Sequence, residues 1–322
     1  MFENIQSFID RHESFILTTH DSPDADGLGA ELVMASILKK KGKEVRIINS
    51  SHVPKYLSFL QEGAEIEKWN PEIHSENLEN KALLILDTSE EHHLGAIRDA
   101  IKKVKESFVI DHHELKPMSK LKGFIDSTAS SASEITLEFA CSLEIELDPH
   151  TATAAYAGIV FDSGFFAYPK TSIRTFKAAM KTMEWGATPN HIYKQLMENS
   201  SCASVLLQKQ ALSSLTFHAG RKIALMVLRW EDFENAGAEF EDVENIVGIP
   251  LRAKEVEAAI LLREKEHGEL FCSLRSKGAL NVSKIAQNFG GGGHVTAAGF
   301  RSYSVDETVK KLLSSVESKL DM

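Results

Sequence analysis

The chain has 322 residues, 43% of them apolar, and a formal net charge of −10, which suits two domains with cores of their own. An acidic chain is a poor general binder of long nucleic acid, because that affinity comes largely from neutralising phosphates. A short ligand that carries phosphate stays possible if cations and a few basic side chains line the site. No apolar run approaches about 18 residues, so we expect no membrane span.

The cysteine content indicates the compartment. The chain has three cysteines, Cys141, Cys202 and Cys272, far apart and without paired metal spacing. Scattered cysteines of this kind are typical of reduced thiols. The amphipathic, acidic N-terminus is unlike a secretion signal. We therefore expect a cytoplasmic protein.

Strand-like and helix-like segments alternate up to about residue 185. Short apolar strands are predicted at 14–19, 44–49, 82–87 and 107–111, and helices at 27–41, near 92–105, and at 131–147, 149–161 and 172–185. Continuously apolar strands that alternate with helices are typical of a parallel sheet with helices on both faces. We predict an α/β domain of this kind over residues 1–185.

The character of the sequence changes after this domain. Residues 186–215 are predicted to form a mainly helical linker, and residues 216–322 a smaller α/β domain. Its predicted elements are strands at 222–228, 255–264 and 269–276, helices at 242–248, 282–289 and 304–320, and a glycine-rich segment at 289–300.

Three predicted strands of the first domain end in polar residues, namely His20, Asp87 and Asp111. In open α/β sheets, ligands bind outside the carboxyl ends of the strands. The three residues therefore predict one shared site.

The turn after the first strand carries His20, Asp24 and Asp26, and Pro23 stiffens it. A helix N-cap accounts for one of the two aspartates. It does not account for the whole set together with Asp87, because crowded carboxylates repel one another and shift their pKa values. A divalent metal ion would resolve this repulsion.

The segment "VIDHHE" (109–114) is a stronger signal. Adjacent histidines after a strand point in different directions, so His112 could bind metal while His113 faces a substrate, and Asp111 could orient His112. Further along, Asp162 lies in an apolar helical pattern, where a carboxylate is costly to bury unless it is paired or binds metal. The alternative is an Asp that caps the helix end before Gly164.

Two further segments could bind phosphate. In "FGGGGH" (289–294), glycines let backbone N–H groups approach a phosphate closely, and the alternative is a flexible hairpin tip. Arg275 could end near the same place and, with His294, would suit a terminal phosphate. For "STASSASE" (127–134) we favour a helix N-cap with Glu134 in a capping box.

In combination these motifs resemble the DHH phosphoesterase superfamily. The matching positions, in chain order, are His20, Asp24, Asp26, Asp87, Asp111, His112, His113 and Asp162. The C-terminal "SLRS" and "VSKIAQNFGGGGHVTAAGF" are similar to the DHH-associated C-terminal domain of RecJ exonucleases and of nanoRNase/pAp-phosphatase proteins. The compact length most resembles the nanoRNase type, since the membrane-bound cyclic-dinucleotide phosphodiesterases carry transmembrane and sensory segments.

The resemblance implies two manganese ions and a role for each motif residue. One ion would be held by His20, Asp24 and Asp87, and the other by Asp26, Asp87, His112 and Asp162, with Asp87 bridging. His113, together with Asp111, would contact the phosphate or protonate the leaving oxygen. The far end of the substrate would be held by Arg275, Gly290, Gly291, Gly292, Gly293 and His294.

The resulting hypothesis is a manganese-dependent phosphodiesterase that acts on short oligoribonucleotides or linear dinucleotides, with 3′-phosphatase activity on pAp as a further activity. The alternatives are a RecJ-like single-strand DNA exonuclease and a nucleotide-binding sensor without catalysis. Members of the resembled family are often dimers, so a homodimer stays open, although no interface signature stands out in the sequence.

Overall fold

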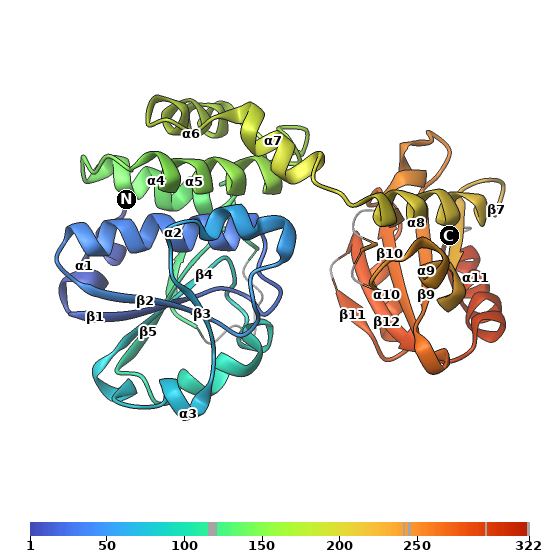
Figure 1. Cartoon of the computed structure of the whole chain (residues 1–322), viewed down its shortest axis with the longest axis horizontal. Coiled ribbons are helices and arrows are strands. Elements are labelled where there is room, and N and C mark those ends of the chain that lie inside the picture. Colours follow the sequence, from blue (N-terminus) through green and yellow to red (C-terminus); the bar gives the residue numbers. More distant parts are fainter. Residues whose placement is uncertain (115–120, 241, 244–245, 294, 321–322) are drawn as a thin grey trace. The chain divides into compact units, whose positions relative to one another are not determined.

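The computed structural model describes residues 1–114, 121–240, 242–243, 246–293 and 295–320. The chain divides into two compact units, Met1–Asn199 and Ser200–Met322 (Figure 1). Each unit has its own six-stranded sheet. The division falls inside the segment predicted as a linker.

The sheet of the first unit is parallel throughout, in the order β3-β2-β1-β4-β5-β6. Its strands are β1 (Ser14–Thr18), β2 (Glu44–Asn49), β3 (Ile66–Lys68), β4 (Ala82–Leu86), β5 (Glu106–Asp111) and β6 (Gly123–Ile125). The central strand β4 is buried at every position. A strand of this kind is apolar on both faces, because both faces of the sheet are covered.

The helical elements of the first unit cover both faces of the sheet. They are α1 (Glu3–Asp10), α2 (Ala25–Lys40), α3 (Pro71–His74), α4 (Ala132–Ser142), α5 (Pro149–Asp162), α6 (Ile173–Glu184), α7 (Pro189–Met197) and the 3₁₀ helices η1 (Lys55–Gln61), η2 (Leu78–Asn80) and η3 (Glu91–Ala100). Helices α2 and α4 pack on one face, α5 packs against both, and α6 lies outside α4 and α5 (Figure 1). The other face packs against η3. The predicted α/β architecture is confirmed.

The second unit contains a mixed sheet in the order β11-β12-β10-β9-β8-β7, with β8 and β9 parallel and the other pairs antiparallel. Its elements are α8 (Cys202–Ser213), β7 (Thr216–His218), β8 (Ile223–Leu228), α9 (Trp230–Ala236), η4 (Ile246–Arg252), β9 (Ala258–Glu264), η5 (Glu266–Gly268), β10 (Leu270–Ser276), α10 (Val282–Gln287), β11 (Gly292–Gly293), β12 (Ala297–Ser302) and α11 (Val305–Leu320). Separate apolar clusters lie on its two faces.

Some predicted elements differ from the structure. The helix predicted near 242–248 is displaced along the chain: a 3₁₀ helix, η4, begins at Ile246 and ends at Arg252, and residues 244–245 lie outside the described residues. The helical segment predicted near 92–105 is the 3₁₀ helix η3, interrupted at Gly95. Five strands were not predicted, namely the very short β3, β6, β7 and β11 and the six-residue β12, which overlaps the predicted glycine-rich segment.

Candidate metal centre

The carboxyl ends of three neighbouring strands position the candidate residues. His20 follows β1, Asp87 follows β4 directly, and β5 ends at Asp111 before His112 and His113. Strands β1, β4 and β5 are adjacent in the sheet, so these ends meet at one edge. The structure therefore brings the predicted strand-end residues together.

A first group of possible metal ligands contains His20, Asp24 and Asp87. Nε2 of His20 lies 3.5 Å from Oδ2 of Asp24 and 3.5 Å from Oδ2 of Asp87. Asp24 is also the N-cap of α2, where its Oδ1 accepts the backbone N–H groups of Asp26 and Gly27. The capping function therefore uses one oxygen of Asp24, and the other oxygen faces His20.

A second group contains Asp26, His112 and Asp162. Nε2 of His112 lies 3.1 Å from Oδ2 of Asp162, 3.8 Å from Oδ2 of Asp26 and 3.3 Å from Oδ1 of Asp87. Asp162 is the last residue of α5. Two of these side chains come from helices and one from the segment after β5, so only the folded unit brings them together.

Asp87 lies between the two groups. Its Oδ2 faces His20 and its Oδ1 faces His112. The residue is only 3% exposed, and its backbone is in the left-handed region with φ of 62°. Few non-glycine residues adopt this conformation, although Asp and Asn do so more often than others. Such strain is concentrated at functional sites, where the surrounding structure holds it in place.

The second group is electrostatically unfavourable without a cation. Burial raises the pKa of Asp26 well above its ordinary value, and the neighbouring carboxylates of Asp87 and Asp162 raise it further. Burial likewise raises the pKa of Asp162 to about 6. Burial is the largest single effect and lowers the pKa of His112, but the nearby carboxylates of Asp87, Asp26 and Asp162 together outweigh it and raise the pKa to about 10. These carboxylates thus favour any positive charge that enters the site.

The donor atoms fit divalent metal. In the described part of the chain, Oδ1 of Asp87 and both ring nitrogens of His112 are buried without a hydrogen-bond partner. Buried polar atoms without partners are rare and require an explanation such as a bound ion. Carboxylate oxygens with a few imidazole nitrogens suit a hard or borderline divalent cation.

The first turn of α4 fixes Asp26. Its Oδ2 accepts the N–H of Ala132 at 2.7 Å, and its Oδ1 accepts the N–H of Ser133 at 2.8 Å. The next N–H, of Glu134, bonds to Oγ of the N-cap Ser131. The predicted N-cap in this segment is confirmed, but the predicted capping box is wrong, because the Glu134 carboxylate accepts the N–H and the hydroxyl of Ser130 and not the N–H of the N-cap Ser131. Because the first-turn N–H groups have partners inside the chain, this helix start is occupied by the protein itself.

Asp111 contacts His113 and not the ring of His112. Oδ1 of Asp111 accepts a hydrogen bond from Nδ1 of His113 at 2.8 Å and also the backbone N–H groups of both histidines. The expectation that Asp111 orients the His112 ring is therefore wrong. Burial is the largest single effect and lowers the pKa of His113, but the hydrogen bond to Asp111 and the negative charges of Asp87 and Asp111 together outweigh it and raise the pKa. The His113 side chain is 44% exposed, so the ring reaches solvent.

The sequence analysis missed several residues near this edge. Nζ of Lys170 donates to the backbone carbonyl of His112 at 2.8 Å and so fixes the segment that carries the two histidines. Donor atoms of Glu90, His92 and His93 also lie close together just beyond Asp87. The adjacent histidines His92 and His93, a few residues after Asp87, could have indicated this group from the sequence.

The predicted phosphate-binding residues lie in the second unit. Arg275 in β10 pairs with Ala297 of β12. The adjacent residue of β12, Ala298, pairs with Gly293 of β11. Arg275 and the glycine run are therefore near one another at the same end of this sheet. Gly290 and Gly293 have positive φ. The predicted partner His294 lies outside the described residues.

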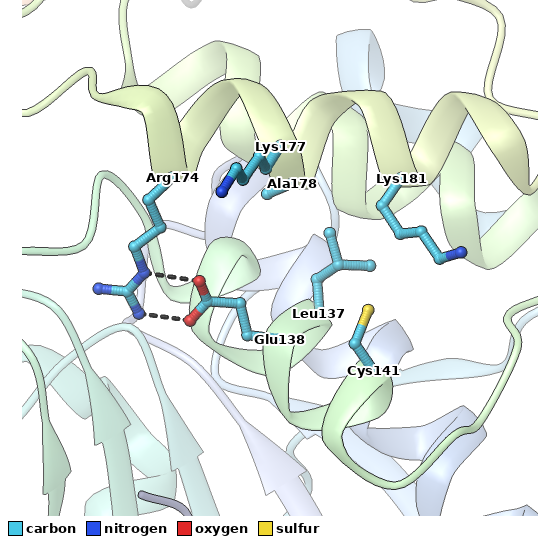
Figure 2. Close-up of a pocket in the computed structure, with 7 residues that line it drawn as sticks. All are labelled: Leu137, Glu138, Cys141, Arg174, Lys177, Ala178 and Lys181. Carbon is cyan, nitrogen blue, oxygen red and sulfur yellow. Dashed lines mark hydrogen bonds and ion pairs between the residues drawn. The ribbon is translucent and has the colours of Figure 1, made fainter.

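A separate pocket lies between α4 and α6 in the first unit (Figure 2). It has a volume of about 340 Å³ and is lined by Leu137, Glu138, Cys141, Arg174, Lys177, Ala178 and Lys181. Arg174 crosses one end of it and bonds to both carboxylate oxygens of Glu138. It contains none of the predicted site residues.

The fold and the motif residues define a class of protein. Residues 14–159 match the DHH family, N-terminal domain, and residues 220–321 match the DHHA1 domain. The chain belongs to the DHH phosphoesterase family, as the motif resemblance predicted.

The chain is also similar to individual proteins within and beyond this family. The chain is 28% identical over 312 residues to the bifunctional oligoribonuclease and PAP phosphatase NrnA of Thermus thermophilus, covering 94% of this chain and 89% of that protein. An exopolyphosphatase-related protein from Bacteroides fragilis has the same fold, with a TM-score of 0.91 at 23% identity, covering 100% of this chain and 97% of that one. The exonuclease RecJ bound to manganese gives a TM-score of 0.55 at 14% identity, covering 97% of this chain and 92% of that one.

Among the described residues, no helix combines the length and the apolar character needed to cross a bilayer.

Proposed function

We propose that this phosphoesterase is a manganese-dependent phosphodiesterase that hydrolyses short oligoribonucleotides or linear dinucleotides and also removes the 3′-phosphate of pAp. The observation that carries the proposal is the pair of adjoining donor groups that share Asp87. The oligoribonuclease and PAP phosphatase named among the relatives supports the choice of substrate.

The donor set suits two divalent ions. His20, Asp24 and Asp87 would hold one ion, and Asp26, His112 and Asp162 the other, with Asp87 contributing one oxygen to each. The carboxylates of Asp24, Asp26, Asp87 and Asp162 carry four negative charges, which two divalent cations balance. Two such ions lower the pKa of a bound water and stabilise the attacking and leaving oxygens.

We propose that His113 acts as the general acid. Asp111 accepts a hydrogen bond from its Nδ1 and raises its pKa, which favours the protonated ring. A partly exposed ring at the rim of the donor groups can deliver that proton from Nε2 to the leaving oxygen. The carboxylate of Asp111 positions the ring and stabilises its charged form.

The second unit would bind the terminal phosphate of the substrate. Gly291 and Gly293 have steric reasons to be glycine, because a Cβ there would lie 2.1 Å from the backbone oxygen of Gly299 and 2.5 Å from that of Ala297, both in β12. At Gly292 a Cβ would meet nothing described within 4 Å. An exposed glycine without an internal steric reason suits close approach of a ligand to the backbone, and Arg275 adds a guanidinium suited to phosphate.

A length series tests the proposal. With Mn²⁺, we expect RNAs of about two to five nucleotides and pAp to be hydrolysed at least about 10-fold faster than single-stranded DNA of about 30 nucleotides. The substitution Asp87→Asn should lower kcat by about 10³-fold or more. The matched control is Asp21→Asn, since Asp21 is an exposed acid beside the same turn that belongs to neither donor group.

Other outcomes discriminate the alternatives. Faster hydrolysis of the long DNA would favour a RecJ-like exonuclease. Nucleotide binding without turnover of any substrate would favour a sensor. Full Mn²⁺-dependent activity in Asp87→Asn would overturn the assignment of Asp87 as the shared ligand.

A further inference from the structure

Helix α2 buries one ionisable side chain among apolar ones. Glu31 is 0% exposed and is the one charged residue in the segment 27–38. Burying a carboxyl group is costly unless it is hydrogen-bonded. In the described part of the chain, Oε1 of Glu31 has no hydrogen-bond partner. An apolar residue would suit the packing of this helix better, so the carboxyl group requires another explanation.

The other oxygen of Glu31 fixes the amide of Asn49. Nδ2 of Asn49, the last residue of β2, donates a hydrogen bond to Oε2 of Glu31 at 3.0 Å. Because only the nitrogen end of an amide can donate, this bond sets which end of the Asn49 side chain faces α2. Asn49 is fully buried, so bulk water does not compete for its hydrogen bonds. The carbonyl oxygen of the amide is thereby turned towards β1.

The carbonyl oxygen of Asn49 holds the end of β1. It accepts the backbone N–H of Thr19 at 3.0 Å and the hydroxyl of Thr18 at 3.2 Å. Both threonines are fully buried. Two successive hydrogen bonds therefore connect Glu31, through Asn49, to the backbone directly before His20.

The position of His20 depends on this backbone. Its Nε2 lies 3.5 Å from Oδ2 of Asp24 and 3.5 Å from Oδ2 of Asp87, and these three residues form the first donor group. Asp26 of the second donor group is fixed by a different element, the first turn of α4. The hydrogen bonds that begin at Glu31 therefore support one donor group and not the other.

We propose that Glu31 is a positioning residue for the ion held by His20, Asp24 and Asp87. It belongs to neither donor group, and through Asn49 it fixes the backbone that presents His20. This inference rests on the two-ion arrangement of the proposed function. Loss of a group that orients a metal ligand from behind typically lowers metal affinity by about 10–100-fold. The loss should fall on one of the two ions.

The hydrogen bond from Asn49 is the basis of this role. Burial raises the pKa of Glu31 to about 8, so its carboxyl group is mostly neutral at neutral pH. A neutral carboxyl group has the shape of the glutamine amide, and both have an acceptor oxygen. Glutamine should therefore replace Glu31. Methionine has a similar size without that acceptor, and it should fail.

Isothermal titration of the metal-free full chain with Mn²⁺ tests the proposal. We expect the wild type and Glu31→Gln to bind two ions, with Kd values that agree within about 3-fold. Glu31→Met should raise the Kd of one ion by about 10-fold or more and leave the other Kd unchanged. The matched control is Thr182→Val, at a buried hydroxyl of α6 outside both donor groups, which should leave both Kd values unchanged.

A combined variant shows which ion is affected. His20→Gln removes a ligand of the first donor group, so adding Glu31→Met to it should cause no further loss of affinity. If Glu31→Met does not fold, Asn49→Ser removes the amide, leaves every ligand in place and should raise the same Kd.

The outcomes separate this inference from the proposed function. Unchanged Mn²⁺ affinities in folded Glu31→Met or Asn49→Ser, or an equal loss at both ions, would overturn the positioning role alone. A wild type that binds fewer than two ions would overturn the two-ion arrangement and this inference with it.

Discussion

At the end of β5, one oxygen of Asp111 binds two backbone N–H groups and the ring of His113. This contact keeps the imidazole protonated above its ordinary range, so an activity that needs the protonated ring falls as pH rises through the raised pKa. The change Asp111→Asn removes the negative charge. We expect the basic limb of the kcat profile to move to lower pH, measured with a dinucleotide substrate and saturating Mn²⁺.

The metal content separates this effect from a damaged site. Asp111→Asn should keep the wild-type manganese stoichiometry, and Asp21→Asn should keep the wild-type pH profile. If the basic limb of Asp111→Asn coincides with that of the wild type at full metal occupancy, His113 is not the group that titrates.

The spacing of residues indicated which side chains would meet, but not how each one would point. His20, Asp24 and Asp26 share one turn, and Asp87 and His112 end neighbouring strands, so topology alone brings them to one edge. The partner of Asp111 depends on the backbone dihedral angles after β5, which no periodicity encodes. Lys170 reaches the carbonyl of His112 from a distant segment, and nothing local marks it.

Among the elements, α2 and α5 pack unusually closely because glycines lie between them. A Cβ on Gly29 would lie 2.6 Å from the backbone oxygen of Ala154 and 2.6 Å from Oγ of Ser133. We expect Gly29→Ala to destabilise the fold by about 1–3 kcal/mol, since a backbone oxygen cannot move aside easily. Thermal unfolding measures this loss. Gly248→Ala, with no described atom within 4 Å of its Cβ, is the control and should change Tm little.

Strands with a continuous apolar run were predictable, whereas β12, which overlaps the glycine-rich segment, and the very short strands were not. Apolar runs indicated β1, β2, β4 and β5 almost to the residue, because strands of a parallel sheet covered on both faces are apolar on both sides. Strands of two or three residues, such as β3, β6 and β11, are too short to show a period. The apolar spacing of α6 was read as helix correctly, but spacing alone does not say whether an apolar face meets its own core or solvent.

For the whole molecule, the two units have separate cores, so we expect them to respond separately to metal. All the candidate ligands lie in the first unit. We expect Mn²⁺ at about 100 times its Kd to raise the transition temperature of that unit by about 5–10 °C relative to a sample with chelator, as measured by calorimetry of the whole chain. The transition of the second unit should move by less than about 1 °C.

The variant Gly29→Ala assigns the transitions, because it should lower only that of the first unit. An equal manganese shift in both transitions, or in the second alone, would contradict the placement of the ions. Composition had indicated two cores, whereas the point of division depends on tertiary contacts that a sequence pattern does not contain.

The left-handed backbone of Asp87 limits which substitutions evolution can accept there. Glutamate has the same charge and the same ligand atoms, but it is not one of the residues that favour this conformation, and its longer side chain would displace both oxygens. Asparagine fits the backbone but lacks the charge. Aspartate meets two independent requirements at this position, the left-handed backbone conformation and the negative charge. Replacement by the chemically similar glutamate or asparagine would each fail one of them.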